Sequence, residues 1–126
     1  MRAVDTNVLL RLITGDDEVQ VKSAEAFVQK GVWVSHLVLA ETIWTLSAGY
    51  AFDADAIAGT IDLLLQHESL TLQDADVVTA ALEHFRRRPA LGFSDCLILE
   101  IARKAGHMPL GTFDKHLSKL DGTQRL

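Results

Sequence analysis

Residues 1–15 read MRAVDTNVLLRLITG, in which a short β-rich start runs into an aspartate and then into an apolar helical repeat. Apolar residues recur at helical spacing until Gly15 ends the repeat. The segment therefore predicts a strand at 2–4, Asp5 at the carboxyl end of that strand, and a helix directly behind it.

The same alternation of strands and helices continues along the chain. Strands that are separated by helices need right-handed crossovers and form parallel sheets covered on both faces. We expect an α/β fold, a three-layer sandwich whose short, mostly parallel central sheet of about four to five strands is flanked by helices. The expected strands are 2–4, 32–34, 70–72, 110–112 and 124–126, and the expected helices are 6–14, 18–30, 36–47, 54–66, 75–88, 94 or 95 to 105, and 115–120.

Length and composition predict one ordinary globular domain over residues 1–126. The chain is 48% hydrophobic and 23% charged, which is unlike the composition of disordered proteins. No apolar run approaches the roughly 20 residues that span a bilayer, and the first ten residues lack the features of a signal peptide, so we expect a cytoplasmic protein. The single cysteine, Cys96, can form neither an internal disulfide nor a zinc cluster.

The charge balance argues against broad binding of nucleic acid through a basic surface. Twelve Lys and Arg residues face 17 Asp and Glu residues, for a formal net charge of −5. The argument weakens if several of the acids converge on bound cations, because the cations reverse the local sign of the potential.

Four acids lie within or beside apolar stretches: Asp5, Glu41, Asp95 and Asp114. Ligands of open parallel sheets bind beyond the carboxyl ends of the strands. Asp5 follows the first expected strand and Asp114 follows the fourth, so one parallel sheet would place both carboxylates on the same rim. Asp95 opens a helix that could face this rim, and a helix N-terminus favours a negative charge.

Glu41 is the only charged residue in LVLAETIWTLSAGYAF, residues 37–52. A helix that is apolar on nearly every side is expected to be buried on nearly every side. Trp33 and Trp44 are expected in the core for the same reason. A buried carboxylate must be neutralised, hydrogen-bonded or bound to a cation, and this helix offers no partner.

Each acid also has a purely structural interpretation. Asp5, Asp95 and Asp114 could cap helices, because aspartate is a leading cap residue. Glu41 could take part in a structural salt bridge. A shared metal pocket would explain all four positions at once. The five histidines show no zinc-ligand spacing, and Arg86–Arg88 is interpreted as a solvated helix end.

At these residues the chain resembles a PIN-domain ribonuclease, and within that family the VapC-type toxins of bacterial toxin–antitoxin pairs. The resemblance rests on VDTNVLLRL at the start, LVLAETIWTL around Glu41, FSDCLILEIARKAG around Asp95 and PLGTFDKHLSKL around Asp114. These segments occur in the family's order and approximate spacing, and the likeness covers nearly the whole chain.

The resemblance implies a catalytic set of Asp5, Glu41, Asp95 and Asp114. In the family such acids line a pocket for Mg²⁺, for which Mn²⁺ substitutes, and Mg²⁺ prefers oxygen ligands. We expect Asp5, Asp95 and Asp114 to hold the metal, and Glu41 to orient or deprotonate the attacking water. Thr112 matches a hydroxyl residue that often accompanies the last acid, and we expect it to bind substrate.

The implied function is a Mg²⁺-dependent endoribonuclease, the toxin of a type II toxin–antitoxin module. It would hydrolyse phosphodiester bonds in structured or single-stranded RNA, such as a tRNA or rRNA loop. The implied partners are an antitoxin whose C-terminal segment fills the active-site groove and a second copy of the chain in a homodimer, without a membrane.

Other functions remain open on the residues alone. A phosphate-accepting receiver domain and a haloacid-dehalogenase-type phosphatase also cluster acids at strand ends. Both need a second acid close to the first, whereas Asn7 stands near Asp5. A third alternative is a binding module that retains the acidic pocket without turnover.

Overall fold

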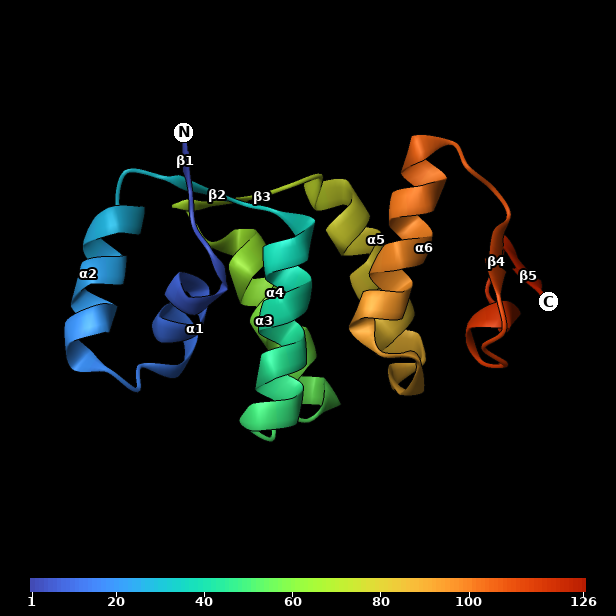
Figure 1. The fold of residues 1–126 in the computed structure, drawn as a ribbon, viewed down its shortest axis with the longest axis horizontal. Coiled ribbons are helices and arrows are strands. Elements are labelled where there is room, and N and C mark those ends of the chain that lie inside the picture. Colours follow the sequence, from blue (N-terminus) through green and yellow to red (C-terminus); the bar gives the residue numbers. More distant parts are fainter. The chain divides into compact units, whose positions relative to one another are not determined.

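Six α-helices and five short strands follow one another in a computed structural model that describes residues 1–126 (Figure 1). The chain divides into two compact units, an N-terminal unit of Met1–Ala75 and a C-terminal unit of Asp76–Leu126. The expectation of one domain over 1–126 stays a prediction. The elements are β1 (Arg2–Ala3), α1 (Thr6–Thr14), α2 (Glu18–Val28), β2 (Val32–Val34), α3 (His36–Gly49), α4 (Ala54–Gln66), β3 (Leu70–Leu72), α5 (Ala75–Arg87), α6 (Phe93–Ala105), β4 (Leu110–Thr112) and β5 (Thr123–Arg125), with 3₁₀ turns at Pro89–Leu91 and Leu117–Lys119.

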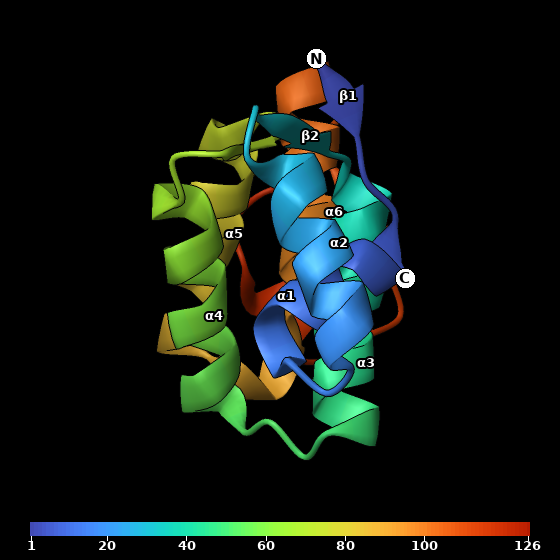
Figure 2. The same cartoon turned by 90° about the vertical axis from the view of Figure 1, so that its left-hand side faces the viewer.

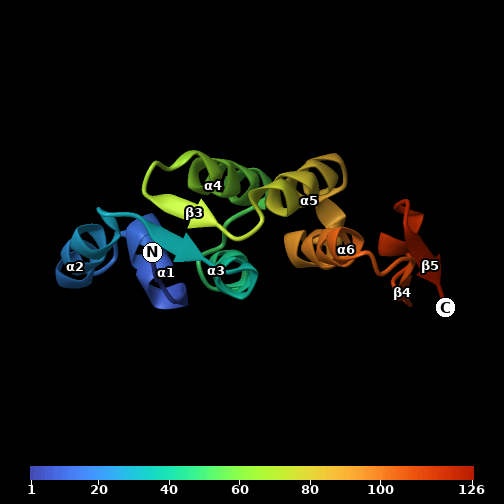
Figure 3. The ribbon, with the colours of Figure 1, turned by 90° about the horizontal axis from the view of Figure 1, so that it is seen from above.

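The N-terminal unit is built on a parallel sheet in the order β1-β2-β3. Helix α1 packs against α2 and α3, and Figure 2 shows α1 and α2 side by side. Helix α4 packs beside β3, as the view from above shows (Figure 3). In β2 the alternation of side chains buries Val32 and Val34 and leaves Trp33 outward, which is the period of a strand.

Short polar side chains determine where the helices of this unit begin. At each of four helix starts the side chain accepts a hydrogen bond from the backbone N–H three residues further on, which satisfies one of the free donors of the first turn. The capping residues are Asp5 for α1, Asp17 for α2, Ser35 for α3 and Asp53 for α4.

In the C-terminal unit α5 and α6 run side by side, and β4 pairs in parallel with β5 (Figure 1, Figure 3). The rings of Phe85 and Phe93 meet edge to face, with 6.3 Å between their centroids. The core of α6 includes Cys96 and Leu99, neither of which is accessible to solvent. No helix of the chain combines the length and the apolar character needed to cross a membrane.

The predicted fold class is confirmed, and all five expected strands form parallel pairs. They are divided, however, into a three-stranded and a two-stranded sheet. The three-stranded sheet with β1 belongs to the N-terminal unit, and the β4-β5 pair belongs to the C-terminal unit. The expectation that Asp5 and Asp114 lie at the rim of one sheet stays a prediction. The expected helix at 115–120 is reduced to the 3₁₀ turn Leu117–Lys119.

Helix α3 has one buried face and one exposed face, so the expectation that it is buried on nearly every side is wrong. Leu39 and Leu46 are buried, whereas the side chains of Leu37 and Trp44 are each 70% exposed. Trp33 is also exposed, at 37%, so neither tryptophan belongs to the core. The apolar composition of α3 misled the prediction because composition does not show which face packs against a neighbour.

Candidate functional site

In the N-terminal unit Asp5 occupies the cap of α1, two residues after β1. Its Oδ1 atom accepts a hydrogen bond from the Val8 N–H at 3.2 Å. The structural interpretation of Asp5 as a cap is thus correct. It does not exclude a metal ligand, because a carboxylate has two oxygens and the cap uses only Oδ1.

Glu41 is tied to the same helix start by Thr6. The Thr6 hydroxyl donates to Glu41 Oε1 at 3.0 Å, which joins the first residue of α1 to the middle of α3. Glu41 is exposed, so the burial expected for its carboxylate is wrong. The structure thus brings Glu41 next to the residue that follows Asp5, and Thr6 emerges as a positioning residue that the sequence patterns did not indicate.

In the C-terminal unit Asp95 lies in the first turn of α6 and does not cap that helix. Gly92 occupies the cap position with a φ of +76°, and no side chain bonds to the free N–H groups there. The expectation that α6 begins at Ser94 or Asp95 is wrong by one or two residues for this reason. The Asp95 carboxylate is half-buried and accepts no hydrogen bond, so nothing in the unit neutralises its charge.

Asp114 stands two residues beyond β4 and organises the turn that follows. Its Oδ1 atom accepts from the His116 N–H at 2.7 Å and from the Leu117 N–H at 2.9 Å. The Thr112 hydroxyl oxygen accepts from the Asp114 N–H at 3.0 Å. Thr112 and Asp114 therefore form one hydrogen-bonded turn, in which Asp114 Oδ2 is left for another partner.

The pKa values of Asp95 and Asp114 are shifted in opposite directions. Burial raises the pKa of Asp95, and the nearby charge of Asp114 raises it further. The backbone N–H groups of Leu117 and His116 lower the pKa of Asp114. A half-buried carboxylate that faces a second carboxylate, without a donor of its own, is a favourable place for a cation.

The four predicted acids are thus divided between the two units. Asp5 and Glu41 lie in the N-terminal unit, where Thr6 joins Glu41 to the start of α1, and Asp95 lies near Asp114 in the C-terminal unit. The structure contains no cluster of three or more His, Cys, Asp or Glu side chains that could hold a metal ion. The donor chemistry nevertheless fits Mg²⁺ or Mn²⁺, because every candidate ligand is a carboxylate and none has both oxygens engaged.

A fifth acid, Glu100, is the buried carboxylate that the sequence patterns assigned to Glu41. Glu100 on α6 is only 7% exposed, and its two oxygens are occupied by His84 and Arg103. The sequence signal for it was present, because Glu100 interrupts the apolar run LILEIA. Arg103 stands three residues further along the same helix, whereas the pairing with His84 was not visible because His84 lies on α5.

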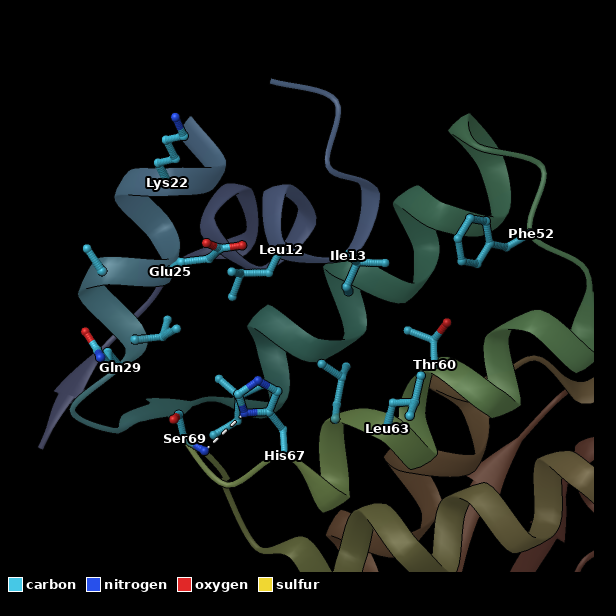
Figure 4. Close-up of a pocket in the computed structure, with 14 residues that line it drawn as sticks. Leu12, Ile13, Lys22, Glu25, Gln29, Phe52, Thr60, Leu63, His67 and Ser69 are labelled. Atoms are coloured by element: carbon cyan, nitrogen blue, oxygen red, sulfur yellow. Dashed lines mark hydrogen bonds between the residues drawn. The ribbon is translucent and has the colours of Figure 1, made fainter. Parts of the chain in front are cut away.

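None of the four acids lines the most prominent groove of the N-terminal unit. It is a groove of about 950 Å³ between α1, α2, α4 and β3, lined by apolar side chains such as Leu12 and Leu63 (Figure 4). Lys22 and Glu25 contribute polar groups to its lining, and His67 Nδ1 accepts from the Ser69 N–H at 3.0 Å. A smaller cavity of about 440 Å³ lies between α1 and α2 and includes Asp5 in its lining. Of these two cavities, the smaller one adjoins a predicted site residue, Asp5.

A known protein-family model matches nearly the whole chain. The sequence profile of the PIN domain matches residues 2–123, which cover both units and all four acids. The chain belongs to the PIN domain family. The resemblance seen in the sequence is therefore confirmed, and the PIN domain match extends from β1 to the first residue of β5.

The chain is also similar to a VapC ribonuclease of Aquifex aeolicus (strain VF5). It is 28% identical to this PIN chain over 126 residues, and the aligned region covers 95% of this chain and 92% of the relative. No solved structure gave a significant match.

Proposed function

We propose that this PIN chain is a Mg²⁺-dependent endoribonuclease and the toxin of a type II toxin–antitoxin module, acting as one domain over residues 1–126 in the cytoplasm. The observation that carries the proposal is Asp95, a half-buried and unpartnered carboxylate beside Asp114 in a chain of this family. The VapC ribonuclease relative supports the nuclease activity and the toxin role.

Asp5, Asp95 and Asp114 would hold the metal ion. In Asp5 and in Asp114 one carboxylate oxygen accepts hydrogen bonds from backbone N–H groups. These bonds fix the carboxylate and leave its second oxygen for a cation. Asp95 has both oxygens available. When bound, the ion lowers the pKa of a coordinated water and offsets the negative charge that develops on the reacting phosphate.

Glu41 would orient or deprotonate the attacking water. Its exposed carboxylate is held by the Thr6 hydroxyl through Oε1, so Oε2 can accept the proton of the water. A fixed base of this kind reduces the entropy lost when water and phosphate are brought together. Asp5→Asn and Glu41→Gln would therefore affect different steps of one reaction.

RNA with exposed bases is the substrate class that we propose, such as a tRNA or rRNA loop. The net charge of −5 gives this chain no general affinity for a phosphate backbone, so recognition has to be local. Thr112 is the proposed substrate-binding side chain. Its oxygen accepts from the Asp114 N–H, which leaves the hydroxyl proton free to be donated to a phosphate oxygen.

The proposed partners are an antitoxin and a second copy of the chain. An antitoxin C-terminal segment that fills the active-site groove could insert an arginine among the acids, because a guanidinium pairs bidentately with carboxylates. The exposed Leu37 and Trp44 side chains are compatible with a homodimer. Light scattering coupled to size exclusion should give the mass of a dimer; a monomer at all concentrations would contradict that part of the proposal.

The deciding experiment is cleavage of total cellular RNA by the purified protein with Mg²⁺, Mn²⁺ or EDTA. We expect discrete products that need the metal and are absent with Asp5→Asn. Asp17→Asn is the matched control, because Asp17 caps α2 through its Oδ1 atom as Asp5 caps α1, yet it is not in the proposed site. Equal cleavage by wild type and Asp5→Asn would overturn the catalytic assignment. Absence of cleavage by the wild-type protein would favour a binding role.

A further inference from the structure

Glu100 stands at the centre of a hydrogen-bonded network in the C-terminal unit. His84 Nε2 on α5 lies 3.0 Å from Glu100 Oε2, and Arg103 Nε on α6 lies 3.2 Å from each of the two carboxylate oxygens. Glu100 is 7% exposed. A buried carboxylate with two basic partners is satisfied and needs no further cation, which separates it from Asp95.

Arg103 extends this network from the helix to the C-terminal strands. Its Nη2 atom donates to the Asp121 carbonyl at 2.7 Å, in the turn directly before β5. The next residue is Gly122, with a φ of +91°. A side chain at Gly122 would collide with the Met108 methyl group and approach the two Nη atoms of Arg103 to 3.0 and 3.1 Å. The guanidinium therefore lies directly against the turn.

The position of this turn bears on the acid pair. Strand β5 pairs with β4, and Asp114 follows β4 by two residues, whereas Asp95 lies on α6 eight residues before Arg103. Eight residues of helix span about 12 Å. Arg103 thus connects the helix that carries Asp95 to the β4-β5 pair that precedes and follows Asp114, two turns of helix away from Asp95.

We propose that Arg103, held by Glu100, is a positioning residue that sets the separation of Asp95 and Asp114 for metal binding. The proposal rests on the proposed function of the acids as metal ligands. Arginine suits this role because its planar guanidinium presents several donors in a fixed arrangement, so one side chain bonds Glu100 and the Asp121 carbonyl together. Lysine has a single ammonium group and a flexible stem.

The neighbouring residue supplies a matched control. Lys104 Nζ on α6 bonds both oxygens of Asp76 on α5, at 3.0 and 3.1 Å. This pair also joins α6 to α5 and is more exposed, with side-chain exposures of 46% and 69%. Lys104→Met removes the same charge as Arg103→Met from the same helix end, without removing the bond to the turn before β5.

The experiment compares Arg103→Met, Arg103→Lys and Lys104→Met with the wild-type chain. Mn²⁺ affinity is measured by electron paramagnetic resonance of free Mn²⁺, and amide hydrogen exchange is measured over residues 110–125. We expect Arg103→Met to weaken Mn²⁺ binding and lower kcat roughly tenfold, as loss of a residue that orients metal ligands does. KM for RNA should stay within about twofold, because Arg103 is not expected to touch substrate.

Arg103→Lys should fall between wild type and Arg103→Met, and Lys104→Met should bind Mn²⁺ like the wild type. Faster exchange over 110–125 in the Arg103 variants, and not in Lys104→Met, supports the proposal. Mn²⁺ affinity in Arg103→Met equal to that in Lys104→Met would overturn it. If Arg103→Met does not fold, Arg103→Lys carries the same test. If the wild type binds Mn²⁺ but cleaves no RNA, the proposed function fails while Mn²⁺ affinity and exchange still test the role of Arg103.

Discussion

Thr6 is the residue that links the first two predicted catalytic acids, since it follows Asp5 and donates to Glu41 at 3.0 Å. Thr6→Val keeps the shape of the side chain and removes the donor. We expect kcat for RNA cleavage to fall roughly tenfold because Glu41 loses its fixed orientation, while KM changes little. The measurement is single-turnover cleavage in Mg²⁺.

Thr6→Ser is the control for this prediction, because serine restores the hydroxyl and should recover most of the rate. A Thr6→Val rate equal to that of the wild type would mean that the bond to Glu41 has no part in catalysis. Loss of activity in both variants would indicate that the threonine methyl group is needed in addition to the hydroxyl.

The raised pKa of Asp95 predicts how this residue affects the stability of the metal-free protein. Its pKa is raised, first by burial and then by Asp114. A carboxyl group whose pKa is higher in the folded than in the unfolded chain favours folding at low pH, and this contribution is lost as the pH rises through the raised pKa. Asp95→Asn should therefore stabilise the metal-free protein near neutral pH by roughly 0.5 kcal/mol, since water screens the half-buried site.

Urea unfolding in EDTA at several pH values measures this difference. The gain from Asp95→Asn should be largest near neutral pH and disappear toward about pH 3, where the carboxyl group is protonated in both states. A variant that is less stable than wild type at neutral pH would contradict the assignment. The same variant should lose metal-dependent cleavage, so stability and activity would change in opposite directions.

At the scale of the element, the two faces of α3 contribute differently to stability, although both carry apolar residues. Leu46 is completely buried, whereas Leu37 is 70% exposed. Leu46→Ala should lower the free energy of unfolding by roughly 2–4 kcal/mol through lost burial and a cavity. Leu37→Ala should change it by no more than about 0.5 kcal/mol in the monomer. Urea unfolding of both variants at low protein concentration provides the measurement.

Unfolding of Leu46→Ala and Leu37→Ala at several protein concentrations also tests the proposed dimer. If α3 contributes Leu37 to a dimer contact, Leu37→Ala becomes destabilising as the protein concentration rises. Similar losses for both alanine variants at low concentration would mean that both faces of α3 are buried in the monomer.

At the scale of the whole molecule, the predicted ligands come from two compact units. A cation that binds only the folded chain stabilises it by RT ln(1 + [M]/Kd), about 2.7 kcal/mol at 100 times Kd. We expect Mn²⁺ to raise the melting temperature of the wild type, and EDTA to reverse the rise. If Asp5 and Asp95 both hold the ion, as proposed, Asp5→Asn and Asp95→Asn should each abolish most of this rise in melting temperature.

Differential scanning fluorimetry with and without Mn²⁺ measures this effect, with Asp17→Asn as the control. If Asp95→Asn loses the stabilisation while Asp5→Asn keeps it, the ion would be held by the C-terminal unit alone. That outcome would contradict Asp5 as a ligand and would leave it as a helix cap.

The sequence by itself determined the elements, the fold class and the resemblance to the PIN domain family. Strands 32–34 and 70–72 and helix 54–66 were predicted at their observed bounds, because side-chain period, caps and glycines act over a few residues. The four acids could be selected in the same way. Each is unusual in its own neighbourhood, and the resemblance added an order and a spacing.

Tertiary structure alone decided which strands pair and which acid is buried. Nothing local shows that β2 pairs with both β1 and β3, because pairing depends on contacts between distant residues. Likewise Glu41 and Glu100 both interrupt apolar runs, yet Glu41 is exposed and Glu100 is buried between His84 and Arg103. A carboxylate is buried where the fold supplies its partners. For Glu100 one partner, Arg103, lies on the same helix, and the other, His84, comes from α5.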